Sequence, residues 1–284
     1  AIPPAARGKV RRVSAQSGGD ELAQAARQID DLVEQAVAVR EELPLSCLTV
    51  GLKCGGSDGL SGLTANPLLG RFSETLCRAG GRAILTEIPE VFGAEKALLS
   101  RATRIDVFNE AAALINRFKR YFLDQGLPVS ENPSPGNLAG GITTLEEKSL
   151  GAVQKGGLAP LNDVIGYGGG ARRCGLTLLE APGNDAVSAT ALAAAGATMV
   201  LFTTGRGTPL GFPVPTVKVA SNHALAETKR HWIDFDAAQV LDCDSEAVDA
   251  DFLARVIAFA SGEKTAAERA GQRSIAIWKR GVTL

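Results

Sequence analysis

The sequence predicts an α/β fold, a Rossmann-like and mostly parallel sheet with helices on both faces, preceded by an N-terminal linker and helix. Two observations lead to this prediction. Short apolar segments alternate with longer segments of helical periodicity over most of the 284 residues, a pattern typical of right-handed β-α-β units. The short segments are also almost continuously apolar, as expected for strands that are covered on both faces.

The first 45 residues are predicted to form a region of their own. Residues 1–15 are polar, basic and proline-containing, which indicates an extended linker. From Asp20 to Glu42, apolar side chains recur at helical spacing, which predicts one amphipathic helix that Pro44 ends. We therefore divide the chain into a linker and helix at 1–45 and a Rossmann-like domain at 46–284. The chain begins with neither Met nor a signal-peptide pattern, as expected for a piece of a longer protein.

Six short runs rich in Val, Ile, Leu and Thr are predicted as strands, because turn-forming or acidic residues bound them. In chain order they are Cys47–Lys53, Arg82–Ile88, Cys174–Glu180, Thr198–Thr204, Thr216–Ala220 and Gln239–Asp242. The segments between and after them have the period of helices. The predicted helices are Asn66–Arg78, Ala94–Asp124, a segment that ends at Gly156 or Gly157, Val187–Ala195 and Asp249–Ala260.

Composition narrows the class of protein. The net charge is −1, so nucleic acid is not expected as a partner. No run of 18 apolar residues occurs, so no membrane span is predicted. The five cysteines are scattered without Cys-x-x-Cys spacing, which argues against a disulfide framework or a zinc finger and favours a reducing cytoplasm. Two histidines are too few for a multi-histidine metal site.

The stretch from Glu131 to Gly157 has the most distinctive local pattern. Two prolines and three glycines within Asn132–Gly141 predict a loop that can approach a ligand closely, and not a helix or a central strand. A helix follows, with a threonine at position 143 or 144 as its cap and a glutamate at the matching capping-box offset. A helix start of this kind can hold an anion. The alternative is a tight surface turn.

Polar and charged side chains collect where the predicted strands end. Because parallel strands share one carboxyl edge, and ligands bind there, these side chains are expected to line one crevice. They suit a hard cation with oxygen ligands, or iron with mixed ligands, beside an arginine that holds a substrate carboxylate. Along the chain they are Cys54, Ser57, Asp58, Glu87, Glu90, Glu180, Asn184, Asp185, Thr203, Thr204 and Arg206.

Each of these residues also has a purely structural interpretation. Cys54 could be a small buried residue at a turn, and Asp58 and Asp185 could be helix N-caps. Glu87 could be a solvated carboxylate at a strand end, and the glycines around Arg206 could form an ordinary turn. The glycines after the first strand do not form a G-x-G-x-x-G pattern, and no P-loop occurs, so the signal for a nucleotide site is weak.

Five longer motifs occur in order along the chain. They are Lys53-Cys-Gly-Gly-Ser-Asp-Gly-Leu-Ser-Gly-Leu-Thr-Ala-Asn-Pro67, Glu87-Ile-Pro-Glu90 with Gly93-Ala-Glu95, Asn132-Pro-Ser-Pro-Gly-Asn137 with Thr144-Leu-Glu-Glu-Lys-Ser-Leu-Gly-Ala152, Ala181-Pro-Gly-Asn-Asp185 and Phe202-Thr-Thr-Gly-Arg-Gly207. Together they resemble the C-terminal part of the altronate dehydratase / galactarate dehydratase family. The resemblance extends from about residue 46 to the end, and the length of its motifs makes it specific.

The resemblance implies a hydro-lyase that converts sugar acids such as altronate or galactarate to a 2-keto-3-deoxy acid, with Fe²⁺ or another divalent cation. It also implies a homodimer in the full-length protein. Family members are longer, with a small N-terminal domain and a middle region of which residues 1–45 would be the tail. Because the family includes a sulfolactate-cleaving enzyme, the substrate stays open.

The residue set then gives a hypothesis for each role. A cation on the substrate carboxylate stabilises the charge that develops when the neighbouring proton is removed by a base within hydrogen-bond reach. The predicted metal ligands are Cys54, Asp58, Glu87 and Glu90. The predicted substrate-binding residues are Asn132, Ser134, Gly136, Asn137, Thr204 and Arg206. The predicted base is Glu146, Asp185 or His223, and the sequence does not choose between them.

Two interpretations that do not involve a lyase stay open. The chain could be a binding or assembly module that holds substrate or a partner subunit without catalysing a reaction. It could also be a nucleotide-dependent oxidoreductase, which the missing dinucleotide fingerprint disfavours.

Overall fold

The computed structural model describes residues 2, 4–16, 18–36, 40–129 and 132–281. The chain divides into two compact units, Ala1–Leu43 and Pro44–Leu284. No helix among the described residues is long and apolar enough to cross a membrane.

The first unit contains the 3-10 helix η1 (Pro4–Lys9) and the helix α1 (Glu21–Gln35). Asp20 caps α1 by accepting a hydrogen bond from the backbone N–H of Ala23 at 2.9 Å. The helix is amphipathic, as predicted, but it has no buried residue within the unit. It also ends before the predicted boundary at Glu42; positions 37–39 of that prediction lie outside the described residues.

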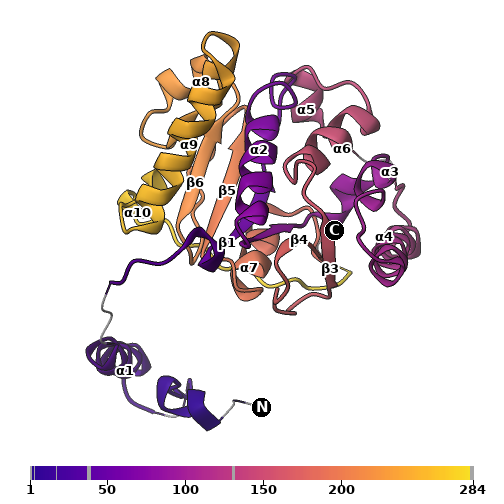
Figure 1. Cartoon of the computed structure of the whole chain (residues 1–284). Coiled ribbons are helices and arrows are strands. Elements are labelled where there is room, and N and C mark those ends of the chain that lie inside the picture. The colour runs from indigo at the N-terminus through magenta and orange to yellow at the C-terminus, as the bar shows by residue number, and fades with distance from the viewer. Residues whose placement is uncertain (1, 3, 17, 37–39, 130–131, 282–284) are drawn as a thin grey trace. The chain divides into compact units, whose positions relative to one another are not determined.

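The second unit is built on a seven-stranded sheet with the order β3-β4-β2-β1-β5-β6-β7. Every neighbouring pair of strands is parallel, which confirms the predicted α/β fold (Figure 1). The strands are β1 (Thr49–Cys54), β2 (Arg82–Leu85), β3 (Leu161–Ile165), β4 (Gly175–Leu179), β5 (Met199–Thr204), β6 (Thr216–Ala220) and β7 (Phe235–Asp236).

Helices cover both faces of this sheet. Their bounds are η2 (Leu45–Cys47), α2 (Ala65–Arg78), η3 (Ile88–Val91), α3 (Glu95–Leu99), α4 (Ile105–Asp124), α5 (Pro135–Ala139), α6 (Leu145–Gln154), α7 (Asp185–Ala194), α8 (His223–Thr228), η4 (Ala237–Leu241), α9 (Ser245–Ala260) and α10 (Ala266–Arg269). The helices α2 and α9 pack on the face that presents Leu52 and Leu201. The helix α7 packs on the opposite face, over Val200 and Phe202.

Gly51 shows how the sequence sets this packing. A Cβ at this position in β1 would lie 2.9 Å from Leu192 Cδ1 of α7, so glycine lets the helix approach the strand closely. The chain runs from β1 to β2 on one side and returns through α7 to β5 on the other side of β1. The ends of β1 and β5 therefore flank a topological switch point, where open α/β sheets bind ligands.

The strand prediction is wrong at the sheet edges. The segment Gln239–Asp242 is not a strand but the end of the 3-10 helix η4 and its C-cap Asp242, because the Asp236 carboxylate caps the start of that helix by accepting from Ala238 N at 2.9 Å. The strand on that edge is β7, which is only two residues long. The other edge strand, β3, was also not predicted, because its Asn and Asp interrupt the apolar pattern in a mostly half-buried position.

Two helix predictions also differ from the structure. The predicted helical region Ala94–Asp124 is divided into α3 and α4 by a short break. The predicted loop Asn132–Gly141 contains the short helix α5. Pro135 stands at its first position, where a helix has no use for an N–H group, and Ser134 and Asn137 form a capping box.

Lys218 is an unusual residue in the middle of β6. Its side chain is fully buried, and Nζ makes no hydrogen bond with any residue that the structure describes. Burial lowers the pKa of Lys218 to about 8, and the charge of Asp234 only partly opposes this change. The Asp234 carboxylate instead accepts the backbone N–H groups of Lys218 and Ala266, at 2.9 and 2.7 Å. A buried amine without a partner destabilises the fold.

The variant Lys218→Met is expected to raise the free energy of unfolding by about 1–3 kcal/mol at neutral pH, because methionine fills the space without a buried polar group. The folded-state pKa of about 8 lies below the unfolded value of 10.5, so the charge penalty is complete below pH 8 and fades towards pH 10.5. Urea unfolding of both proteins at pH 7 and pH 10 measures this. Equal stabilities at pH 7 would contradict the interpretation.

Candidate active site

Six ionisable side chains converge at the carboxyl ends of β1 and β2. Two come from the end of β1, and two lie at the start and inside of η3, directly after β2. The other two come from α6 and its C-terminal cap, and α6 packs against η3. We call this group the Cys54 cluster; it consists of Lys53, Cys54, Glu87, Glu90, Lys148 and Lys155.

Three potential metal ligands form the centre of the cluster. Cys54 Sγ and one carboxylate oxygen each from Glu87 and Glu90 lie within 4.8 Å of one another. The Cys54 thiol donates a hydrogen bond to Glu90 Oε2 at 2.8 Å, and its backbone N–H donates to Glu87 Oε2 at 3.1 Å. The fold therefore brings together three of the four residues that the sequence proposed as metal ligands.

Two buried ammonium groups hold Glu87 in place. Lys53 Nζ pairs with Glu87 Oε1 and also lies 2.7 Å from Asp185 Oδ1 at the start of α7. Lys155 Nζ lies 3.4 Å from Glu87 Oε2. Burial by itself would lower the pKa of Lys53, but the charges of Glu87 and Asp185 outweigh it and raise that pKa. Lys53 therefore stays charged although it is completely buried.

Lys148 holds Glu90 in place on the other side of the cluster. Its Nζ lies 2.7 Å from Glu90 Oε2 and 3.5 Å from Cys54 Sγ. Burial opposes ionisation of Glu90, but the charges of Lys148 and Lys155 lower its pKa to about 2. Burial, with the charges of Glu87 and Glu90, raises the pKa of the Cys54 thiol. Without a cation, the cluster therefore contains a protonated thiol beside paired charges.

Glu87 also has a strained backbone. Its φ of 63° and ψ of 62° lie in the left-handed region, which residues other than glycine rarely adopt. Such strain persists only where the surroundings hold it, and it concentrates at functional sites. Here the ion pairs from Lys53 and Lys155 and the hydrogen bond from Cys54 N hold the carboxylate. This feature supports a functional role for the end of β2.

Asp58 lies in a different hydrogen-bond network from the other three predicted ligands. Its Oδ1 accepts from the hydroxyls of Ser61 and Ser221, both at 2.7 Å, and its Oδ2 accepts from Asn222 Nδ2 at 2.9 Å. These bonds tie the loop after β1 to the turn after β6. The geometry is that of a loop-fixing carboxylate at the rim of the site.

The predicted substrate loop reaches the same rim. Asn137 Nδ2 donates to Ser57 O at 2.9 Å, and this bond fixes α5 against the loop after β1. Gly136 provides space for Arg206, because a Cβ on this glycine would collide with the guanidinium group. The Arg206 side chain is exposed. Ser134 is the N-cap of α5.

The remaining predicted residues occupy varied positions. Asn132 is half-buried just before Pro133. Thr204 Oγ1 accepts the backbone N–H of Gly207 at 2.9 Å and so shapes the turn that presents Arg206. Of the three candidate bases, Asp185 contacts the Cys54 cluster through Lys53. Two others do not contact it in the part of the chain that the structure describes: Glu146 is exposed on α6, and His223 binds Asp236 and Asp242.

The three lysines of the cluster are not among the site residues predicted from the sequence. Lys53 carries a usable signal, because a lysine at the end of an otherwise apolar buried strand needs a partner there. Lys148 and Lys155 have no such signal. They lie among polar residues on a helix, and only the packing of α6 against η3 shows that they point inward.

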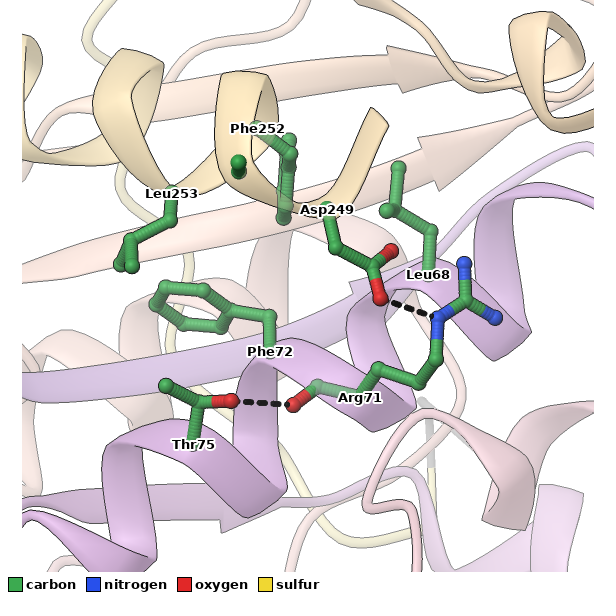
Figure 2. Close-up of a pocket in the computed structure, with 8 residues that line it drawn as sticks. Leu68, Arg71, Phe72, Thr75, Asp249, Phe252 and Leu253 are labelled. Atoms are coloured by element: carbon green, nitrogen blue, oxygen red, sulfur yellow. Dashed lines mark hydrogen bonds and ion pairs between the residues drawn. The ribbon is translucent and has the colours of Figure 1, made fainter. Parts of the chain in front are cut away.

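Two adjacent hollows lie beside the cluster. A small cavity of about 40 Å³ is lined by Lys148, Asn66 and residues of the loop after β1. A wider groove of about 650 Å³ shares four lining residues with it and exposes Leu150 and Leu158. Figure 2 shows a separate pocket of about 140 Å³ between α2 and α9, where Arg71 and Asp249 pair at 2.6 Å. No cluster residue lines that pocket.

Comparison with known proteins identifies the family of this chain. The family model described as D-galactarate/Altronate dehydratase, C-terminal, matches residues 45–283. The chain belongs to this family. The match includes all six residues of the Cys54 cluster and the rim around Asp58 and Arg206.

Individual relatives agree with the family match. The chain is 52% identical over 279 residues to an altronate dehydratase from Bacillus subtilis, a match that covers 97% of this chain and 56% of the relative. It is 53% identical over 246 residues to an altronate dehydratase from Escherichia coli, covering 86% and 50%. A galactarate dehydratase (L-threo-forming) from Escherichia coli is 37% identical over 202 residues, covering 71% and 39%. The chain thus spans about half the length of the two altronate dehydratases.

The His223 contacts give a prediction about pH. Hydrogen bonds to Asp236 and Asp242, at 2.6 and 2.7 Å, raise the pKa of His223 above its usual 6.5. The stabilisation is therefore complete below pH 6.5 and is lost as the pH rises through the raised value. Because the ring is 44% exposed, the effect should be a few tenths of a kcal/mol.

The variant His223→Gln should therefore lose stability relative to the parent at pH 5.5 and approach it at pH 8.5. Thermal unfolding midpoints at both pH values measure the difference. Parallel curves for the two proteins would mean that the imidazolium does not bridge the two aspartates in solution.

Proposed function

We propose that this chain carries the catalytic cluster of a sugar-acid dehydratase, a carbon–oxygen lyase that converts an aldonate such as altronate, or the aldarate galactarate, to a 2-keto-3-deoxy acid. The observation that supports it most is the Cys54 cluster within a chain of the dehydratase family. A buried group of acids, bases and a thiol at the carboxyl ends of parallel strands is where proton removal next to a carboxylate can be catalysed.

We also propose that the cluster binds a divalent cation, with Fe²⁺ as the first candidate. A thiolate and two carboxylates within 4.8 Å of one another fit such an ion, which accepts mixed sulfur and oxygen ligands. The cation can bind only if the ion pairs of these carboxylates adjust. Glu87 and Glu90 already pair with lysines, so the cation would share or replace those partners. When bound, it would supply Lewis-acid polarisation of the substrate carboxylate and hydroxyl.

The protein groups then divide the remaining work. The lysines of the cluster stabilise the negative charge that develops on the carboxylate as the neighbouring C–H bond breaks. We assign the base to Asp185, because it contacts Lys53 and its side chain is still 35% exposed to an incoming ligand. The hydroxyl on the next carbon leaves with a proton as water, and the resulting enol becomes the 2-keto-3-deoxy acid. Glu146 and His223 stay predicted alternatives for the base.

Substrate recognition at the rim is part of the same proposal. Arg206 is exposed between Gly56 and Gly136, where its guanidinium can meet a carboxylate or a hydroxyl of the substrate chain. Asn132, Ser134 and Asn137 shape the loop beside it. The homodimer and the cytoplasmic location predicted for the full-length protein, like the domain division at 1–45 and 46–284, stay predictions.

A substrate panel tests the activity. The chain is purified without oxygen, loaded with Fe²⁺ and given altronate, galactarate and sulfolactate, and the 2-keto-3-deoxy acid or released sulfite is measured. We expect the keto acid from at least one sugar acid. Sulfite alone would favour the sulfo-lyase alternative, binding without turnover would favour a substrate-holding module, and turnover that requires NAD(P) would favour an oxidoreductase.

The metal assignment is tested separately with Cys54→Ser, Glu87→Ala and Glu90→Gln. Each should lower bound iron at least tenfold and turnover at least 100-fold, because each removes one of three ligands. Cys243→Ser is the matched control, since this cysteine is exposed and outside the cluster. Iron content and turnover that stay at the parent level in the Glu87 variant would falsify the assignment.

A further inference from the structure

The small cavity beside the Cys54 cluster has the features of a binding site. It measures about 40 Å³, and its lining includes Ser57, Asn66, Gly151 and Lys148. Since one water molecule needs roughly 10–15 Å³ of such space, the cavity can take a group of a few non-hydrogen atoms. Lys148 connects it to the cluster, because the same ammonium group contacts Glu90 and Cys54.

Two donors in this lining, both on largely buried residues, are not used by the protein. Asn66 is 3% exposed, and its Oδ1 accepts the hydroxyl of Thr203 at 2.9 Å. That bond directs Nδ2 away from Thr203, and Nδ2 has no hydrogen-bond partner among the residues that the structure describes. Ser57 is also 3% exposed; its carbonyl accepts from Asn137, whereas its hydroxyl has no partner within the described chain. Neither Nδ2 nor this hydroxyl is fully enclosed by the protein, so both can donate to a group that enters the cavity.

One side chain in the cavity lining is positively charged. Lys148 is 4% exposed, and its ammonium group also pairs with Glu90 of the cluster at 2.7 Å. Two acidic residues also line the cavity, and each accepts hydrogen bonds from neighbouring residues. Asp58 accepts four hydrogen bonds from Ser61, Ser221 and Asn222, and Glu147 accepts two from Thr143. The donors of the lining that have no partner among the described residues are Asn66 Nδ2 and the Ser57 hydroxyl.

We propose that this cavity is the subsite for the substrate carboxylate next to the reacting carbons, with Asn66 Nδ2, the Ser57 hydroxyl and the Lys148 ammonium group as its donors. The chemical class of the ligand is a small 2-hydroxy carboxylate. The proposal rests on the proposed dehydratase function. It places the carboxylate within reach of the Cys54 cluster, whereas Arg206 at the exposed rim serves the far end of the substrate, which in an aldarate is a second carboxylate.

Gly151 supports this placement. It lies on α6 opposite Asn66, and a Cβ on Gly151 would lie 3.2 Å from Asn66 Nδ2. A methyl group at this position would therefore crowd the donor. Glycine is a poor choice inside a helix unless space is needed, and alanine there favours the helix. The glycine thus keeps the cavity open at the donor that has no partner.

Two variants test the subsite without removing its fold. Asn66→Asp keeps the acceptor for Thr203 and replaces Nδ2 by an oxygen, and Gly151→Ala narrows the cavity. The ligands are D-altronate and D-altritol, the same chain without the carboxylate, measured by calorimetric titration. The parent should bind altronate at least tenfold more tightly than altritol.

Both variants should weaken altronate binding at least tenfold and leave altritol binding unchanged. The melting temperature of Gly151→Ala should also stay unchanged. Asn109→Asp, at an exposed position on α4, is the control and should match the parent.

Parent-like altronate affinity in Asn66→Asp, or an equal loss for altronate and altritol, would overturn the proposal. So would a loss of the altronate preference in Arg206→Gln alone, because the carboxylate would then lie at the rim. Turnover is measured on the same samples to separate the two claims. If altronate binding depends on Asn66 but no product forms, the dehydratase function is wrong and the subsite proposal stands. If Asn66→Asp turns over altronate with an unchanged KM, the subsite proposal is wrong and the dehydratase function stands. A parent that binds neither ligand overturns both.

Discussion

Lys53 and Glu87 form the ion pair on which the rest of the site depends. Both side chains are almost fully buried, and a buried charge without a partner costs several kcal/mol. The pair lies where β1 and β2 end, so it joins the two central strands at the edge where loops must diverge. Because Glu87 sits in a left-handed conformation, its carboxylate turns back towards Lys53 and Cys54 and not outward to solvent. Lys155 and Lys148 then extend the network to α6, and Asp185 extends it to α7.

This network makes the geometry of the Cys54 cluster depend on the position of α6. Lys148 and Lys155 are seven residues apart on one helical face, and each pairs with a different glutamate. The helix is fixed at its start by Thr144, whose hydroxyl accepts from Glu147 N at 3.1 Å, and beside η3 by Ser149, whose hydroxyl donates to Phe92 O. A shift of α6 along its axis would unpair both lysines at once. The stretch after Asn132 was predicted as a site that holds an anion. Its main contribution to the cluster is instead the pair of ammonium groups on Lys148 and Lys155.

The sequence predicts the parts of the structure that repeat a regular pattern. Strands β1, β2, β4, β5 and β6 are apolar runs, and they were found within a few residues of their bounds. The edge strands β3 and β7 were missed because an edge strand needs less apolar burial, and the predicted strand at Gln239 failed because a local cap decided its conformation. The rule that parallel strands share one carboxyl edge also predicts that Cys54, Glu87 and Glu90 lie together, as they do. It could not separate them from Asp58, because that depends on which turn supplies the hydroxyl partners, Ser61 and Ser221.

The charge balance of the cluster restricts how ligands can enter. Lys53, Lys148 and Lys155 match Glu87, Glu90 and Asp185, three positive charges against three negative ones. A divalent cation alone would add two positive charges next to three ammonium groups in a region of low dielectric constant, which opposes its binding. A substrate carboxylate adds negative charge at the same place and offsets part of that repulsion. In the proposed function, binding of the cation and of the sugar acid would therefore favour each other, and by linkage the coupling would act equally in both directions. All the charges of the cluster are paired in the free protein. The cluster therefore suits a substrate whose carboxylate adds negative charge together with the cation.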